Sequence, residues 1–254
     1  MRLADLRLEV RPRGAYEAMD LGVRLAQSEA PQLWKTWFLV SVPVLLLAAA
    51  LTLLLESGAL YLLLWWLKPL YDYALLILLS RRVFGETPTL REMARLLAAS
   101  WRQGLAAHLF WRRFTLSRAY LLPAWLLENL PAPERQARLA LLRHQYGGKA
   151  QWLHVVMLHL EAFLFLAAAS LLFWFAPEGA SDDLWQLFTG DRASTAAALA
   201  NLGLYFLAMT LVEPFYVAAG FTLYLNRRSE LEAWDLELAF RRLRERLDAH
   251  RRAP

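Results

Sequence analysis

Four ionisable residues lie inside long apolar stretches of the sequence: Lys68, Asp72, Glu161 and Glu213. A charged side chain at the centre of a bilayer costs about 2.5 kcal/mol or more, so each of them should face the interior of a helix bundle and find a partner there. Lys68 and Asp72 are four residues apart and can pair on one face of a helix. We therefore predict an intramembrane polar centre in which Lys68 pairs with Asp72 and Glu213.

This predicted centre has two interpretations. It could be a path for protons or ions, or a polar cavity for a lipid headgroup. It could instead be a structural ion pair that fixes how the two halves of the chain dock. We favour the structural pair, because one lysine neutralised by nearby carboxylates is what packing specificity alone requires.

Other groups with chemical potential are poorly placed. His154 and Glu161 share a helix face, but His159 projects to almost the opposite side at about 100° per residue, so we do not expect a metal site. The chain has no cysteine, which excludes disulfides and thiolate ligands. No Walker A, GxSxG or GxGxxG motif occurs. We expect no metal, no cofactor and no enzymatic activity.

The elements that must position the polar centre are membrane spans. Hydrophobic residues make up 58% of the 254 residues and charged residues only 20%, against about 25% in soluble proteins. About 20 apolar residues cross the bilayer core as a helix. The sequence predicts four spans, at 36–55, 59–80, 152–175 and within 196–226. Because Pro69 and Pro214 lack an N–H group, we expect Pro69 to break its helix and the fourth span to tilt or break near Pro214.

The basic residues predict the orientation of these spans. Of the 28 Lys and Arg residues, 26 lie in the N-terminal arm, between the second and third spans, or in the C-terminal tail. Cytoplasmic flanks carry the Lys and Arg excess, so both termini are predicted to be cytoplasmic. The excess of Arg over Lys is typical of GC-rich bacterial genomes, which favours a bacterial inner membrane. Since the charge lies beside membrane ends, it does not indicate nucleic-acid binding.

The two halves of the chain share a pattern that predicts an internal repeat. KPLY at 68–71 aligns with EPFY at 213–216, and each is followed at nearly the same distance by a basic pair, Arg81 and Arg82 or Arg227 and Arg228, expected to anchor at headgroups. Lys68 and Glu213 lie about 20 and 21 Å from these pairs by helical rise, so they should be level with each other.

A capping box follows each basic pair, formed by Thr89 with Glu92 and by Ser229 with Glu232. We predict an all-α integral membrane helical bundle of four transmembrane helices, arranged as two parallel two-span repeats with amphipathic cytoplasmic helices. Residues 1–130 form the first repeat and residues 131–254 the second.

Shorter helices are expected outside the spans. Helical spacing of apolar residues predicts them at 14–30, 90–104, 117–130 and 134–146, with Gly147 and Gly148 ending the last one. Arginines and aromatic residues are mixed through 83–150. This segment therefore either lies in the headgroup layer or forms a small cytoplasmic cap, and the sequence favours neither.

The C-terminal tail predicts one more helix, which we expect to start at Ser229 and to be the principal docking surface. Leu231, Trp234 and Leu238 form an apolar stripe on it at helical spacing. The stripe could bind a partner, pack on the chain's own 90–104 helix, or lie on the bilayer with its arginines at acidic headgroups.

Three stretches resemble a known group of proteins: FYVAAGFTLYLNRRSELEAWDLELAFRRL at 215–243, RPRGAYEAMDLGVRL at 11–25 and LLLWWLKPLYDYALLILLSRRVFGETPTLRE at 62–92. They resemble bacterial multi-span inner-membrane proteins encoded beside a MoxR-type AAA+ ATPase, a von Willebrand A-like protein, an RDD-family protein and a homologue of sporulation stage II protein M. The layout is also similar to the membrane domain of some glycerophosphodiester phosphodiesterases. The resemblance implies protein partners and supplies no catalytic residues.

Taken together, these features predict a non-enzymatic subunit or scaffold of a bacterial inner-membrane complex that docks partners through its cytoplasmic helices. Its expected partners are membrane lipids and other protein subunits, including a MoxR-type ATPase system. The alternative is a small transporter or lipid-handling protein that works through Lys68, Asp72, Glu161 and Glu213. The two differ in whether these buried charges can be replaced by apolar residues.

Overall fold

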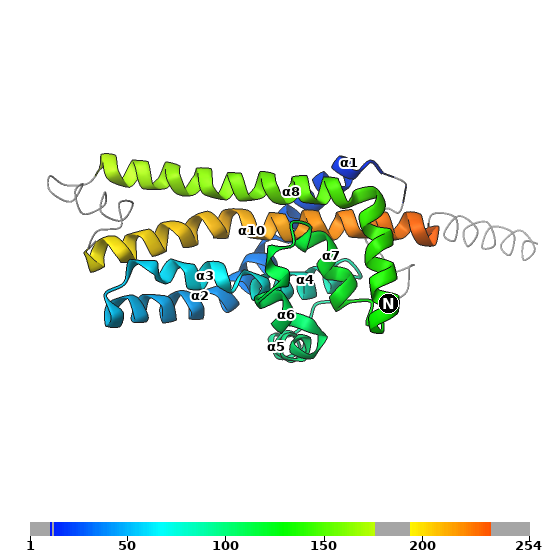
Figure 1. The fold of residues 1–254 in the computed structure, drawn as a ribbon, viewed down its shortest axis with the longest axis horizontal. Coiled ribbons are helices and arrows are strands. Elements are labelled where there is room, and N and C mark those ends of the chain that lie inside the picture. The colour runs from blue at the N-terminus through cyan, green and yellow to red at the C-terminus, as the bar shows by residue number, and fades with distance from the viewer. Residues whose placement is uncertain (1–10, 12, 176–193, 235–254) are drawn as a thin grey trace, which may run out of the picture.

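The computed structural model describes residues 11, 13–175 and 194–234 of the chain (Figure 1). All regular elements among these residues are helical. Four stretches are long and apolar enough to cross a membrane: α2 (Ala30–Leu55), Gly58–Arg82, α8 (Ala132–Trp174) and α10 (Thr195–Glu232). The chain is thus a multi-pass membrane protein.

The spans lie side by side and give the bundle two different ends (Figure 1). At the loop end, α2 turns into the second span, α8 ends and α10 begins. At the opposite end, called the cap end, shorter helices gather around the spans: α1 (Ala15–Ser28), α5 (Leu90–Ser100), α6 (Ala106–Leu109) and α7 (Arg118–Leu126).

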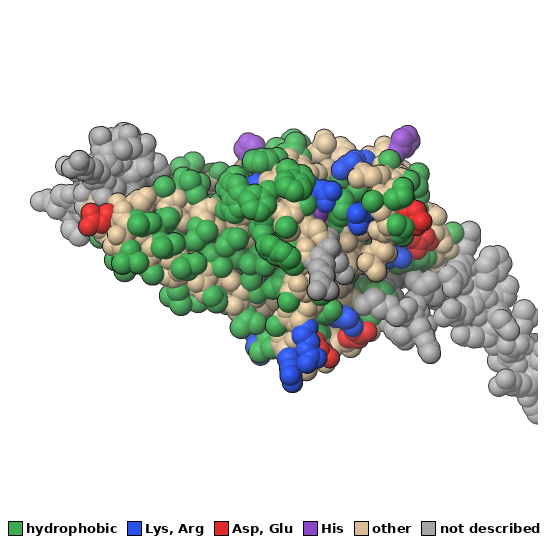
Figure 2. Space-filling view, turned by 60° about the horizontal axis from the view of Figure 1, so that its bottom comes forward, with side chains coloured by type: hydrophobic (Ala, Val, Ile, Leu, Met, Phe, Trp, Pro, Cys, Tyr) green, Lys and Arg blue, Asp and Glu red, His purple; other side chains and the backbone are tan. Residues whose placement is uncertain are grey.

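Apolar side chains cover the outside of the spans toward the loop end. Leu54 is 77% exposed, Phe163 67% and Trp174 86%. Figure 2 shows this apolar surface, with most of the charged side chains gathered toward the other end of the molecule. A continuous apolar surface of this kind suits lipid tails, which solvate it without cost.

The second span is broken into two helices. Its first part is the short turn η2 (Gly58–Leu60) with α3 (Tyr61–Trp66), and its second part is α4 (Lys68–Arg82), with Leu67 between them at φ −87° and ψ 5°. Pro69 explains the break, because it has no N–H to donate to the carbonyl of Trp65 four residues earlier. The predicted break at Pro69 is confirmed.

The predicted break at Pro214 is wrong. α10 runs without interruption from Thr195 to Glu232, with Pro214 inside it. The helix contacts α1, α2, α4, α7 and α8, so neighbours on several sides support its axis. In a packed membrane bundle, surrounding elements compensate for the hydrogen bond that an internal proline removes.

Gly147 and Gly148 do not end a helix either. α8 continues through both glycines, and its first part crosses the cap end before the rest runs along the bundle (Figure 1). A glycine terminates a helix by adopting a left-handed conformation, and neither of these two has a positive φ. α8 bends between its first part and the rest (Figure 1). Gly147 and Gly148 are the only glycines of α8, and no proline lies beyond its first turn, so we attribute this bend to the two glycines.

The two predicted capping boxes have different outcomes. The first is confirmed: the Thr89 hydroxyl accepts from the Glu92 N–H at 3.3 Å, and the Glu92 carboxylate accepts from the Thr89 N–H at 2.8 Å. The second is wrong, because Ser229 lies inside α10, where its hydroxyl donates to the Asn226 carbonyl at 2.9 Å. The preceding turns of α10 already satisfy the N–H groups that a cap would serve. The remainder of the predicted C-terminal helix lies outside the described residues.

Of the other predicted short helices, α7 is the most deeply integrated. Every residue of α7 is buried, and the helix packs on α8 and α10. Trp101, Trp111 and Phe114, in the turns before α7, are instead 58–70% exposed. The segment between the second and third spans therefore combines a buried helix with exposed aromatic turns.

Two glycines bring short helices very close to α10. A Cβ atom on Gly22 of α1 would lie 2.5 Å from the Cα of Ala219, and one on Gly220 of α10 would lie 2.4 Å from the Cβ of Ala119 in α7. Small residues at membrane-helix interfaces permit this close backbone approach. α1 and α7 thus pack closely against residues 218–220, on two faces of α10.

We expect Gly220→Ala to lower the midpoint of thermal unfolding of the purified protein, followed by circular dichroism in detergent. The added methyl group must push α7 away from α10, at a cost of about 1–3 kcal/mol. Gly203→Ala on the same helix is the matched control, because no atom lies within 4 Å of its added Cβ. It should be neutral or stabilising, since alanine favours helices over glycine by about 1 kcal/mol. Equal midpoints for the two variants would contradict the close contact.

Candidate functional site

Five charged side chains meet inside the bundle, where the second span breaks. Lys68 and Asp72 lie on the first turns of α4, Arg118 begins α7, Glu161 is on α8 and Glu213 is on α10. None of the five is more than 6% exposed. We call these five residues the polar centre.

Ion pairs join the polar centre into one chain. Lys68 Nζ contacts Glu161 Oε2 and lies 2.8 Å from Glu213 Oε2. Arg118 Nη2 lies 2.9 Å from Glu213 Oε1, and Arg118 Nε lies 2.6 Å from Asp72 Oδ2. The charges therefore alternate in sign along the order Glu161, Lys68, Glu213, Arg118 and Asp72.

Sequence reasoning found four of these five residues, and the predicted pair of Lys68 with Glu213 is confirmed. The predicted pair of Lys68 with Asp72 is wrong, because Asp72 instead pairs with Arg118. Arg118 was missed because it lies outside every apolar stretch. A charge count could have found it: three buried carboxylates and one lysine call for a second cation.

Charge balance indicates that the polar centre holds one proton. Its three carboxylates exceed its two cations by one, and an uncompensated charge is costly in an apolar interior. The set of five is neutral when one carboxyl group is protonated. This proton is the simplest way to balance the ion-paired set.

Arg113 stabilises the break in the second span. Its Nη2 donates to the Trp65 carbonyl and its Nη1 to the Trp66 carbonyl, both at 3.0 Å. The Trp65 carbonyl is the acceptor that Pro69 leaves without a helical donor. The guanidinium also stacks on the Trp65 ring, 3.8 Å from its centroid. Arg113 thus compensates the end of α3 with a donor from the segment before α7.

Two cavities approach the polar centre from different sides. Toward the loop end, a cavity of about 320 Å³, called the loop-end cavity, is lined by Glu161 and aromatic rings. Near the cap end, a cavity of about 90 Å³, called the cap-end cavity, is lined by Arg118, His108 and Arg143. The ion pairs from Glu161 to Arg118 therefore lie between the two cavities.

His108 is a neutral group in the cap-end cavity. Burial, opposed by the hydrogen bond with the Gly104 carbonyl and assisted by the charges of Arg112 and Arg118, lowers the pKa of His108 to about 4. Its Nδ1 lies 3.0 Å from that carbonyl and 3.1 Å from the Tyr73 hydroxyl. At neutral pH, an uncharged imidazole therefore shares a cavity with Arg118.

His154 and His159 do not join the polar centre. His154 Nδ1 is 2.8 Å from the Tyr216 hydroxyl, which also accepts from the Ala119 N–H at 3.2 Å. His159 is exposed and hydrogen-bonds with the Val155 carbonyl at 2.7 Å. Within the described part of the chain, no three His, Asp or Glu side chains are grouped so that they could hold a metal ion.

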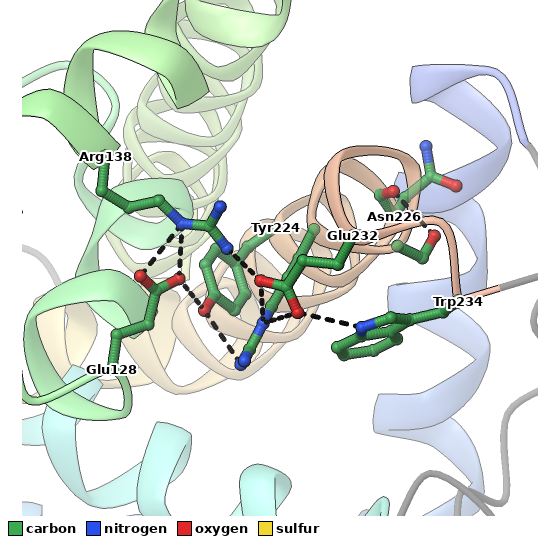
Figure 3. Close-up of polar contacts among 8 residues, drawn as sticks. Glu128, Arg138, Tyr224, Asn226, Glu232 and Trp234 are labelled. Atoms are coloured by element: carbon green, nitrogen blue, oxygen red, sulfur yellow. Dashed lines mark hydrogen bonds and ion pairs between the residues drawn. The ribbon is translucent and has the colours of Figure 1, made fainter. Parts of the chain in front are cut away.

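The predicted docking residues lie at the cap end. Trp234 is 7% exposed, and its indole N–H donates to Glu232 at 2.9 Å (Figure 3). Arg228 lies over the indole ring, 5.2 Å from its centroid. Leu231 is partly buried, and Leu238 lies outside the described residues. Trp234 is thus held within the chain's own packing.

The four predicted basic anchors also have partners within the chain. Arg81 pairs with Glu86 and Arg82 with Glu29, each at 2.6 Å. The second basic pair is bound on its own helix at 3.0 Å, with ion pairs of Arg227 to Glu230 and Arg228 to Glu232. These pairs join the basic residues to acidic partners at the cap end.

Comparison with known proteins found no matching family model, curated protein or solved structure. The function of the polar centre is therefore argued from its geometry and charge. The resemblance to the inner-membrane proteins encoded beside MoxR-type ATPases stays a prediction.

We expect Lys68→Met to destabilise the protein by about 3–5 kcal/mol, because it removes the buried cation that pairs with Glu161 and Glu213. Adding Glu213→Gln should recover part of this loss. Thermal unfolding of both single variants and the double variant in detergent measures the coupling. Lys149→Met is the matched control, since Lys149 is exposed on α8. A double variant as damaged as the sum of the single variants would contradict the pairing.

Proposed function

We propose that the chain is a small membrane transporter whose polar centre passes a proton between the loop-end cavity and the cap-end cavity. One observation carries the proposal: the ion pairs from Glu161 through Lys68 and Glu213 to Arg118 lie between two cavities. A purely structural ion pair does not require a cavity on each side. The sequence alone favoured a non-enzymatic subunit and gave a small transporter as the alternative; we propose the transporter.

Lys68 is suited to move charge within the polar centre. Its ammonium contacts both Glu161 and Glu213, and its flexible stem allows it to follow whichever carboxylate is ionised. A proton that arrives at Glu161 removes the charge that holds Lys68 there and strengthens its pairing with Glu213. Arg118, fixed by Glu213 and Asp72, gives the cap-end side a constant positive charge.

The broken second span supports the same proposal. Transporters commonly place polar sites where membrane helices are interrupted, because the freed backbone groups and helix ends can serve the site. Here the break between α3 and α4 lies directly before Lys68. Because Arg113 holds the freed carbonyls, the break is a specified feature of the fold.

Replacing Glu161 separates a transport role from a structural one. Glu161→Gln leaves Lys68 paired with Glu213 and leaves two carboxylates for two cations, so the fold should be retained. We expect it to reduce proton uptake to the level of protein-free liposomes, measured with a trapped pH dye under a valinomycin-driven potential. Glu134→Gln, at an exposed position of the same helix, is the matched control. Wild-type flux no higher than that of empty liposomes, or full flux in Glu161→Gln, would refute the relay.

We also propose that the protein lies in a bacterial inner membrane, with the cap end and both termini in the cytoplasm. The excess of Lys and Arg in the segments at the cap end supports this orientation. The two-repeat organisation is part of the same proposal. It is supported by the direct pairing of Lys68 with Glu213, which occupy equivalent positions in the two halves.

Cysteine labelling tests the orientation without background, because the chain has no cysteine. Ser57→Cys at the loop end should react with an impermeant thiol reagent in intact spheroplasts. Thr87→Cys, at an exposed position of the cap end, should react only after the membrane is permeabilised. The opposite labelling pattern would reverse the orientation.

Docking of partner subunits is the second candidate function. A groove of about 620 Å³ at the cap end favours it, since α4, α5, α7 and α10 all contribute to its walls. Burial of Trp234 counts against the particular stripe that the sequence predicts. A subunit of this kind, which uses the polar centre only for packing, should keep its activity in Glu161→Gln, whereas the proposed transporter should lose it.

A further inference from the structure

The loop-end cavity combines aromatic rings with one carboxylate. Tyr61 on α3 and Phe165 on α8 each pack edge-on against the ring of Tyr205 on α10, with centroids 5.8 and 6.3 Å apart. The carboxylate of Glu161 and the amide of Asn201 line the same cavity. Three elements of the bundle therefore contribute to one aromatic pocket with an acidic wall.

This combination favours a positively charged ligand. The faces of aromatic rings attract cations, and quaternary ammonium groups are bound by cages of several such rings. Glu161 belongs to a set of ion-paired charges with one carboxylate in excess. The buried Tyr205 hydroxyl faces Glu161 and adds a polar group to the acidic wall.

The size of the cavity limits the ligand. About 320 Å³ lies at the lower end of the range for small-molecule sites, which is about 300–1,000 Å³. The space therefore suits a headgroup-sized cation and not a whole lipid.

We propose that the loop-end cavity binds an organic ammonium group, and that this cation exchanges for the proton of the polar centre. The exchange rests on the proposed function, whereas the binding does not. The ammonium can belong to a free amine or to a lipid headgroup such as ethanolamine or choline, because the two present the same chemistry to the cavity.

The exchange conserves charge. Glu161 faces Lys68 of α4 and Glu213 and Tyr205 of α10, and Tyr61 of α3 lines the same cavity. Two other cations lie nearby: Arg118 is paired with Glu213 and Asp72, and Arg113 is engaged with the carbonyls of Trp65 and Trp66. When an ammonium enters, the single proton of the polar centre leaves to water, and the net charge is unchanged. Ammonium affinity should therefore rise with pH, because proton and cation compete.

The first test uses the unaltered protein. Binding of choline to the purified full chain is compared by calorimetry with binding of 3,3-dimethylbutanol, which has the same shape without the charge. We expect choline to bind about tenfold more tightly or better, since cation–π attraction in a desolvated site corresponds to about that factor. Equal affinities, or no binding of choline, would overturn the inference.

Variants locate the site. Tyr205→Leu and Glu161→Gln should each weaken choline binding by about tenfold, while Phe163→Leu should leave it unchanged because Phe163 is 67% exposed on the outer face of α8. Thermal unfolding of each variant shows that it is folded. Wild-type affinity in both cavity variants would place the ammonium elsewhere and overturn the assignment.

Proton release tests the exchange. Calorimetry in two buffers with different ionisation enthalpies should report about one proton released per choline bound. Binding without proton release would overturn the exchange. Proton flux without choline binding would refute this inference alone, and choline binding without proton flux would refute the proposed function alone.

The source of the ammonium is resolved in nanodiscs. If lipid headgroups occupy the cavity, phosphatidylethanolamine should weaken choline binding relative to discs of phosphatidylglycerol alone. If free amines are the ligand, the two lipid compositions should give the same affinity. Either result is compatible with the ammonium site and identifies which source fills it.

Discussion

The cost of placing charge in an apolar interior governs this structure. Three carboxylates inside the bundle can persist only beside cations, and only one lysine lies in the membrane spans close to them. The structure meets this requirement by bringing Arg118 from the segment before α8 to Asp72 and Glu213. These ion pairs join α7 to α4 and α10 inside the bundle.

The segment between the second and third spans therefore works as part of the membrane bundle. Arg113 compensates the carbonyls at the break of the second span, and Arg118 completes the polar centre five residues later. The Arg118 pair with Glu213 joins α7 to α10, and Gly220 permits the close approach of these helices by leaving room for Ala119. Backbone packing, helix interruption and charge compensation are thus linked through one short stretch of chain.

Several features follow from the sequence alone because they depend on local properties. Long apolar stretches predict four spans, since a helix is the structure that satisfies every backbone group in lipid. Lys68, Glu161 and Glu213 are expected to meet, because each charge is intolerable alone. The capping box at Thr89 and the break at Pro69 depend on neighbouring residues, and both are present.

Only the tertiary structure decides among options that local sequence leaves equal. Pro69 and Pro214 occur in matching patterns, yet one lies at a break and the other inside a continuous helix, because α10 has packed neighbours on several sides. Asp72 could pair with Lys68 one turn away, but Arg118 approaches it from another element. A proline in the sequence leaves a carbonyl without a donor, and a buried carboxylate requires a cation. The elements packed around them determine which group supplies that donor or cation.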